Sequence, residues 1–136
     1  WRSPTPATVA AASANKNRTS INWEPWSPAA VDRAVADGKP VLVDFTAKWC
    51  LTCKVNKALA IEVPTVRERM KALGFVALRG DYTREDPAIA MELKRWKRAG
   101  VPLVLVYSRN PDVPPRVLPE QLTPGLVMDA LEWAGK

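Results

Sequence analysis

The sequence contains no histidine and only two cysteines among its 136 residues. Without an imidazole the chain cannot form a Cys/His catalytic pair, a Cys-x-x-Cys-His haem attachment motif or a mixed Cys/His zinc site. Two cysteines alone cannot complete a tetrahedral zinc shell either, so we expect no metal site. Cys50 and Cys53, which are spaced by two residues, are therefore most simply a dithiol that cycles with its own disulfide.

Long apolar runs are also missing. No window approaches the roughly 20 apolar residues of a membrane-spanning helix, so we expect this fragment to be soluble and any membrane part to lie outside it. The chain begins at Trp1 and shows no basic and then apolar leader. We therefore expect it to be a mature or excised piece of a longer protein.

A concentrated charge of one sign is missing as well. The 20 Lys and Arg residues and the 14 Asp and Glu residues leave a net charge of +6, but acidic and basic residues are interspersed along the chain. The densest basic cluster, residues 94–98, falls on a predicted helix. This dispersion favours an ordinary solvated surface over nucleic-acid binding, with docking of a protein partner as the smaller alternative.

The composition is that of an ordinary globular protein, with 47% apolar and 25% charged residues. A chain of this length suits one folded domain with a single core. Its beginning is rich in Ala, Ser, Thr, Asn and Pro with little apolar periodicity, which is typical of a linker. We therefore predict a flexible linker or arm over residues 1–22 and a folded domain over residues 23–136.

Strand and helix signals alternate along the folded part. The pattern predicts strands at residues 41–45, 75–78, 103–107 and 117–118, and helices from Ser27 to Gly38, from the Cys pair to Pro64, from there to Gly74, from Asp86 to Gly100 and from Thr123 onward. The apolar run 41–45 is typical of a central strand that is covered on both faces. This alternation indicates an α/β fold in which helices flank both faces of a central sheet.

Cys50 lies where one of the predicted helices begins. Unpaired backbone N–H groups and the positive end of the helix dipole favour thiolate over thiol at such a position. Helix-terminal Cys-x-x-Cys thiols have pKa values lowered to roughly 3.5 to 7.5, so Cys50 is the candidate nucleophile. Cys53, one turn further on, can attack a mixed disulfide at Cys50 and release the partner, which makes it the candidate resolving cysteine. An inert bridge is the alternative, but closing so small a loop would add little stability.

Asp44 is a carboxylate inside an apolar strand, six residues before Cys50. Such a group is costly unless it is paired, exposed or used in chemistry. If it points under the helix that starts at the Cys pair, it can accept the Cys53 proton through water as a general base. The alternative is a carboxylate at the edge of the strand that faces solvent.

Val101-Pro102 places a proline at the entrance to an apolar strand. A cis bond there would make a tight and rigid turn, whereas a trans proline would merely begin an edge strand. The residues alone leave both conformations open.

These three features, in this order, resemble the thioredoxin superfamily. They are Val43-Asp44-Phe45, Trp49-Cys50-x-x-Cys53-Lys54 and Gly100-Val101-Pro102. The resemblance implies a thioredoxin-like fold with a mixed sheet, a cis Pro102 that faces the Cys pair, and a backbone at Val101 that pairs with an extended partner segment. Trp49 would flank the redox site, with an ordinary packing aromatic as the alternative. Trp49, Val101 and Pro102 are therefore the candidate substrate-binding residues.

At a finer level, residues 23–133 resemble the C-terminal periplasmic domain of DsbD-type and ScsB-type membrane thiol:disulfide interchange proteins. The residues that carry this resemblance are 50–56, Val101-Pro102-Leu103 and Leu118-Pro119-Glu120. Members of that family often carry a glutamate four residues after the second cysteine, where this chain has Lys57. A cation there should favour thiolates, so carboxylate tuning would fall to Asp44 alone if Lys57 faces the site. Lys57 and Lys54 are the candidate tuning residues.

The resemblance implies a reductive electron relay without a cofactor besides the Cys50–Cys53 disulfide. A membrane-embedded domain would pass two electrons to this disulfide, and the reduced pair would then reduce a periplasmic thioredoxin-like domain or another protein disulfide. The location would be periplasmic, as a domain of an inner-membrane protein. Two alternatives stay open: a free-standing thioredoxin-like reductase with many substrates, and a non-catalytic thioredoxin-fold binding module with vestigial cysteines.

Overall fold

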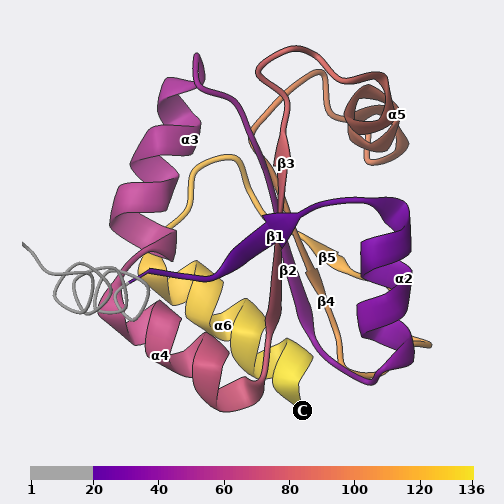
Figure 1. Ribbon diagram of the computed structural model, residues 1–136. Helices are drawn as coiled ribbons and strands as arrows, with labels where there is room; N and C mark the ends of the chain where they lie inside the picture. Colours follow the sequence, from indigo (N-terminus) through magenta and orange to yellow (C-terminus); the bar gives the residue numbers. More distant parts are fainter. Residues whose placement is uncertain (1–19) are drawn as a thin grey trace, which may run out of the picture.

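The computed structural model describes residues 20–136 as a five-stranded sheet with helices on both faces (Figure 1). The strands are β1 (Trp23–Pro25), β2 (Val41–Thr46), β3 (Val76–Asp81), β4 (Leu103–Tyr107) and β5 (Arg116–Val117). The helices are α2 (Pro28–Ala36), α3 (Leu51–Asn56), α4 (Pro64–Leu73), α5 (Pro87–Arg95) and α6 (Pro124–Gly135), and a short π-helical segment, η1 (Lys57–Ile61), continues α3. In this described range, each helix is too short or too polar to cross a membrane.

Strand β2 lies at the centre of the sheet, whose order is β1-β3-β2-β4-β5. It pairs in parallel with β3 and antiparallel with β4, so the sheet is mixed, as predicted. The chain leaves β2 at Thr46 and reaches the start of α3 within a few residues. The cysteine pair therefore lies at the carboxyl end of the central strand, where open α/β sheets commonly carry their functional sites.

The alternation of side chains along β2 divides the core into two layers. Val43 and Phe45 pack with buried residues of α2 and α5, whereas Leu42 packs with buried residues of η1, α4 and α6. Figure 1 shows the same division, with α3, α4 and α6 on one side of the sheet and α2 and α5 on the other. Asp44 follows Leu42 by two residues, so it lies on the face that α3 and η1 cover.

Local signals explain where several helices begin and end. Ser27 caps α2, because its hydroxyl accepts a hydrogen bond from the Ala30 N–H at 3.0 Å. Pro64 is the first residue of α4, so a separate helix begins at this proline, as predicted. Gly74 ends α4 in the left-handed conformation, with a φ of 73°.

The structure differs from the sequence-based prediction in three elements. The pattern predicts no strand at Trp23–Pro25, because three residues that pair with a distant strand leave no periodic signal. Helix α5 ends at Arg95 rather than near Gly100, since Lys97 already has a positive φ of 61°. The change from α-helix in α3 to π-helix in η1 also has no recognisable sequence signature.

The predicted arm lies almost entirely outside the described residues. Ile21, near its end, packs against the core and donates its N–H to a Glu62 carboxylate oxygen at 2.9 Å. The flexibility of residues 1–22 stays a prediction.

Candidate active site

Cys50 and Cys53 form a disulfide at the start of α3. Cys50 is the N-cap residue of this helix, and its Sγ accepts a hydrogen bond from the Cys53 N–H at 3.1 Å. The first N–H groups of a helix have no partner within the helix. One of them is therefore directed at the sulfur of Cys50, where it would stabilise a thiolate.

Both cysteines are almost completely buried in the disulfide form. Cys50 is 7% exposed and Cys53 is 5% exposed, so exposure hardly distinguishes the two residues in the disulfide form. They pack with Ala47, and Tyr82 and Val101 lie against them. The Val101–Pro102 peptide bond is cis, which settles the conformation that the sequence leaves open. Within residues 20–136, no group of three or more His, Cys, Asp or Glu side chains could hold a metal ion.

Trp49 stands next to the disulfide with 57% of its surface exposed. Its indole Nε1 donates to the Thr83 carbonyl at 3.1 Å, and its ring meets the ring of Tyr82 edge-on with centroids 6.4 Å apart. Leu51, on the other side of Cys50 in the chain, is 75% exposed. An anchored indole and an exposed leucine thus form an apolar surface beside the disulfide.

Asp44 is buried, so the alternative of a solvent-facing carboxylate is wrong. Burial raises its pKa from the ordinary 3.8 to about 6, and the Glu62 carboxylate acts weakly in the same direction. The positive charges of Arg79 and Lys57 oppose this effect and lower the pKa. A carboxyl group that titrates at about 6 can accept and return a proton near neutral pH.

The two candidate tuning lysines differ in their relation to Asp44. Lys57 is exposed on η1, yet its charge acts on the Asp44 carboxyl. Lys54 is exposed on α3, and its charge is not among those that shift the pKa of Asp44. Those charges are on Arg79, Lys57 and Glu62. An effect of either lysine on the cysteine thiols stays a prediction.

Replacing Lys57 with glutamate is expected to raise the pKa of Asp44 above about 6. The substitution removes a cation that lowers this pKa and puts an anion in its place. A titration of the Asp44 carboxyl carbon by NMR in the oxidised protein measures the shift directly. Lys54→Glu makes the same change of charge on α3 and is the matched control, for which we expect a much smaller shift. Equal shifts in both variants would mean that only the net charge of the protein matters.

Sequence reasoning misses several residues that shape the site. Arg79 lies directly opposite Asp44 in the register of β2 and β3, and the sequence contains no signal for this register. Thr83 follows β3, and its hydroxyl accepts the Lys48 N–H at 2.9 Å. Hydrogen bonds from the Thr83 side chain and backbone hold the pKa of Asp81 below its usual range. These contacts join the end of β3 to the loop that carries the cysteines.

A family model and several known proteins match this chain, and the matched range of the family model includes the site. A thioredoxin-like family model matches residues 22–108. Thiol:disulfide interchange protein DsbD 1 of Pseudomonas aeruginosa is 38% identical over 90 residues, which cover 63% of this chain and 15% of that protein. DsbD of Klebsiella pneumoniae is 33% identical over 84 residues, which cover 60% of this chain and 14% of that protein. The chain thus spans only a small part of the length of these relatives.

Solved structures share the fold. The oxidised C-terminal domain of DsbD from Neisseria meningitidis superposes with a TM-score of 0.59 at 26% identity, covering 80% of this chain and 94% of that one. A thioredoxin from Thermus thermophilus superposes with a TM-score of 0.64 at 21% identity, covering 83% and 85%. The predicted thioredoxin-like fold is confirmed, and the predicted enzyme class, thiol:disulfide interchange, agrees with the names of the DsbD relatives.

Proposed function

Since the chain belongs to the thioredoxin-like family, we propose that it is a thiol:disulfide oxidoreductase that reduces protein disulfides through Cys50 and Cys53. The observation that carries this proposal is the disulfide at the first turn of α3. The Cα atoms of the pair are 5.3 Å apart, within the ordinary range for a disulfide. This backbone geometry is therefore suited to a bridge between the two residues.

Reduction of a partner proceeds in two exchange steps. The Cys50 thiolate attacks one sulfur of the partner disulfide, so that the partner S–S bond breaks, its other sulfur leaves as a thiolate, and a mixed disulfide forms. Cys53 then loses its proton and attacks the sulfur of Cys50, which breaks the mixed disulfide. The partner leaves as a dithiol with two additional electrons, and Cys50 and Cys53 are joined in a disulfide.

We assign the proton acceptor for Cys53 to Asp44. The carboxyl lies on the face of the sheet that α3 and η1 cover, and its pKa of about 6 suits proton exchange near neutral pH. Transfer through a water molecule would connect the two groups. The Lys57 cation, which already acts on Asp44, would keep this carboxyl more acidic than burial alone allows.

The surface beside the disulfide suits a protein substrate. Trp49 and Leu51 are exposed, and Val101 lies against the cysteine pair. An extended partner segment would pair with the backbone at Val101 as an added strand, which would bring its disulfide to Cys50.

The finer proposal is a place in an electron relay. A membrane-embedded domain would reduce the Cys50–Cys53 disulfide, and the reduced pair would pass both electrons to a periplasmic protein disulfide. This would make the chain a periplasmic domain of an inner-membrane protein. Its support is the similarity to thiol:disulfide interchange proteins that extend far beyond the matched region. A free-standing reductase is the alternative, and it would reduce many partners rather than few.

In the reduced protein, Cys50 is expected to react with iodoacetamide at a pH midpoint well below that of an unperturbed thiol, about 8.5. The helix start, with its N–H groups and dipole, stabilises the thiolate. Alkylation rates across neutral pH, with mass spectrometry to locate the label, give the midpoint and the order of reaction of the two thiols. Cys50→Ser retains only Cys53 and is the control. An unshifted midpoint, or label on Cys53 first, would contradict the assignment of the nucleophile.

A further inference from the structure

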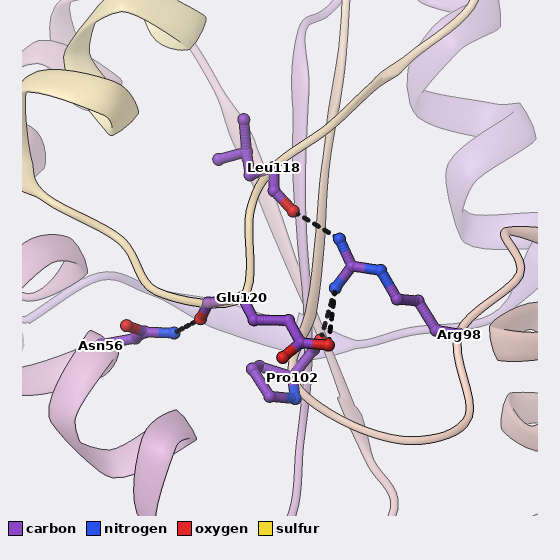
Figure 2. A network of polar contacts seen from close by, with 5 residues as sticks. All are labelled: Asn56, Arg98, Pro102, Leu118 and Glu120. Carbon is purple, nitrogen blue, oxygen red and sulfur yellow. Dashed lines mark hydrogen bonds and ion pairs between the residues drawn. The ribbon is translucent and has the colours of Figure 1, made fainter.

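The connection between β5 and α6 contacts both sides of the candidate active site. We call its residues 118–122 the strap. Figure 2 shows that Asn56 reaches the strap from α3, while Arg98 reaches it from the connection between α5 and β4. The first of these elements carries the cysteines, and the second leads into Val101 and Pro102.

On the α3 side the link is Asn56, which comes three residues after Cys53 and is 4% exposed. Its Nδ2 donates to the Glu120 carbonyl at 2.7 Å, and its Oδ1 accepts the Leu122 N–H at 3.0 Å. Both ends of this buried amide are thus satisfied by the backbone of the strap. Loss of either bond would leave a buried polar group unpaired, so the link resists displacement of α3 relative to the strap.

On the other side the link is Arg98, whose side chain is 18% exposed. Its Nη1 donates to the Pro102 carbonyl at 3.1 Å, and its Nη2 donates to the Leu118 carbonyl at 2.8 Å. The Glu120 carboxylate lies 3.9 Å from Nη1. Because the guanidinium is planar and rigid, one side chain holds the Pro102 carbonyl and the strap in a defined relation (Figure 2).

We propose that Asn56 and Arg98 are positioning residues that set, through the strap, the spacing between Cys50 and the Val101–Pro102 backbone. The inference rests on the proposed function, in which a partner pairs with that backbone while its disulfide meets Cys50. A protein disulfide must make both contacts at once, so this spacing determines how well it binds. A small disulfide makes only the contact with Cys50 and does not depend on the spacing.

Arg98→Ala is expected to raise the KM for a disulfide-bonded substrate protein about tenfold, as the loss of a charged hydrogen bond would. The rate with hydroxyethyl disulfide and the alkylation rate of Cys50 should change little. Arg98→Lys, which keeps the charge and one donor, should recover part of the loss. The matched control is Arg109→Ala, because Arg109 also donates from Nη2 to a backbone carbonyl, that of Leu73 at 2.6 Å, but follows the opposite end of β4.

Asn56→Asp provides a second test, on the α3 side of the strap. It keeps the acceptor for the Leu122 N–H and removes the donor to the Glu120 carbonyl. We expect a rise in KM in the same direction as for Arg98→Ala. Because both residues act through the strap, the rise in KM of the double variant should be smaller than the two single rises combined.

Comparing the reduction of a protein disulfide with that of hydroxyethyl disulfide distinguishes a positioning role of the strap from a purely structural role. Should the variants unfold at lower denaturant concentration while the ratio of protein to small-disulfide reduction stays that of the wild type, the strap is structural only and the inference is wrong. If Arg98→Ala does not fold, Arg98→Lys and Asn56→Asp carry the same comparison. A wild-type protein that reduces hydroxyethyl disulfide but no protein disulfide would instead overturn the proposed function.

Discussion

Replacing Cys53 with alanine will trap partner proteins on Cys50 as adducts that a reductant releases. The variant keeps the sulfur at the N-cap of α3, which attacks a partner disulfide, and removes the sulfur that would resolve the mixed disulfide. Multiple-turnover reduction should fall to the uncatalysed rate, whereas the first exchange step should survive. Non-reducing gels of cell extract measure the adducts, and mass spectrometry identifies the captured proteins.

The control for this experiment is Cys50→Ala, which should lose turnover equally but form few adducts. Adducts that form only with Cys50→Ala would reverse the roles of the two cysteines. The identity of the captured proteins also separates the candidate functions. One or two dedicated redox partners would favour the relay, while many unrelated partners would favour a free-standing reductase. The absence of adducts with either variant would favour a binding module.

The oxidised Asp44→Asn protein will be more stable than the wild type at neutral pH, and this difference will diminish in acid. Burial raises the pKa of Asp44 in the folded state to about 6, above its ordinary value of 3.8. The folded state therefore binds this proton more tightly than the unfolded state. The stabilisation that protonation of Asp44 contributes is fully present below about pH 3.8. It decreases as the pH rises and is lost above about pH 6. The difference in pKa corresponds to about 3 kcal/mol of unfolding free energy.

Guanidinium chloride unfolding at pH values on both sides of this range measures the effect. The asparagine side chain does not titrate, so the variant should lack the wild-type loss of stability between acid and neutral pH. Asp129→Asn, on α6, is the matched control and should keep that loss. A pH dependence that is the same in wild type and Asp44→Asn would show that Asp44 does not titrate in this range.

The same substitution should slow the resolution step while the fold becomes more stable. Asparagine cannot accept the Cys53 proton, so the attack of Cys53 on the mixed disulfide loses its base. Single-turnover exchange measured between about pH 6 and 8, the range in which a group with this pKa serves as a base, separates this step from the first attack. Equal rates for Asp44→Asn and the wild type in that range would remove Asp44 from the mechanism.

Short stretches of neighbouring residues were enough to predict the chemistry that the site can carry. They contain the spacing of Cys50 and Cys53, the helix that begins there, and the apolar strand that includes Asp44. Caps, periodicity and spacing act locally, so they can be interpreted without knowledge of the rest of the molecule. The α/β order of elements follows from them, because strands that alternate with helices have few ways to pack.

The contacts between these strands, helices and loops were revealed only by the tertiary structure. The burial of Asp44 depends on which face of the sheet α3 and η1 cover, and its pKa depends on Arg79, which the strand register places opposite it. The link from Asn56 to Glu120 joins residues 64 positions apart. Pairing across such distances follows from the packing of the whole core rather than from any local pattern, because each contact depends on where all the other elements lie.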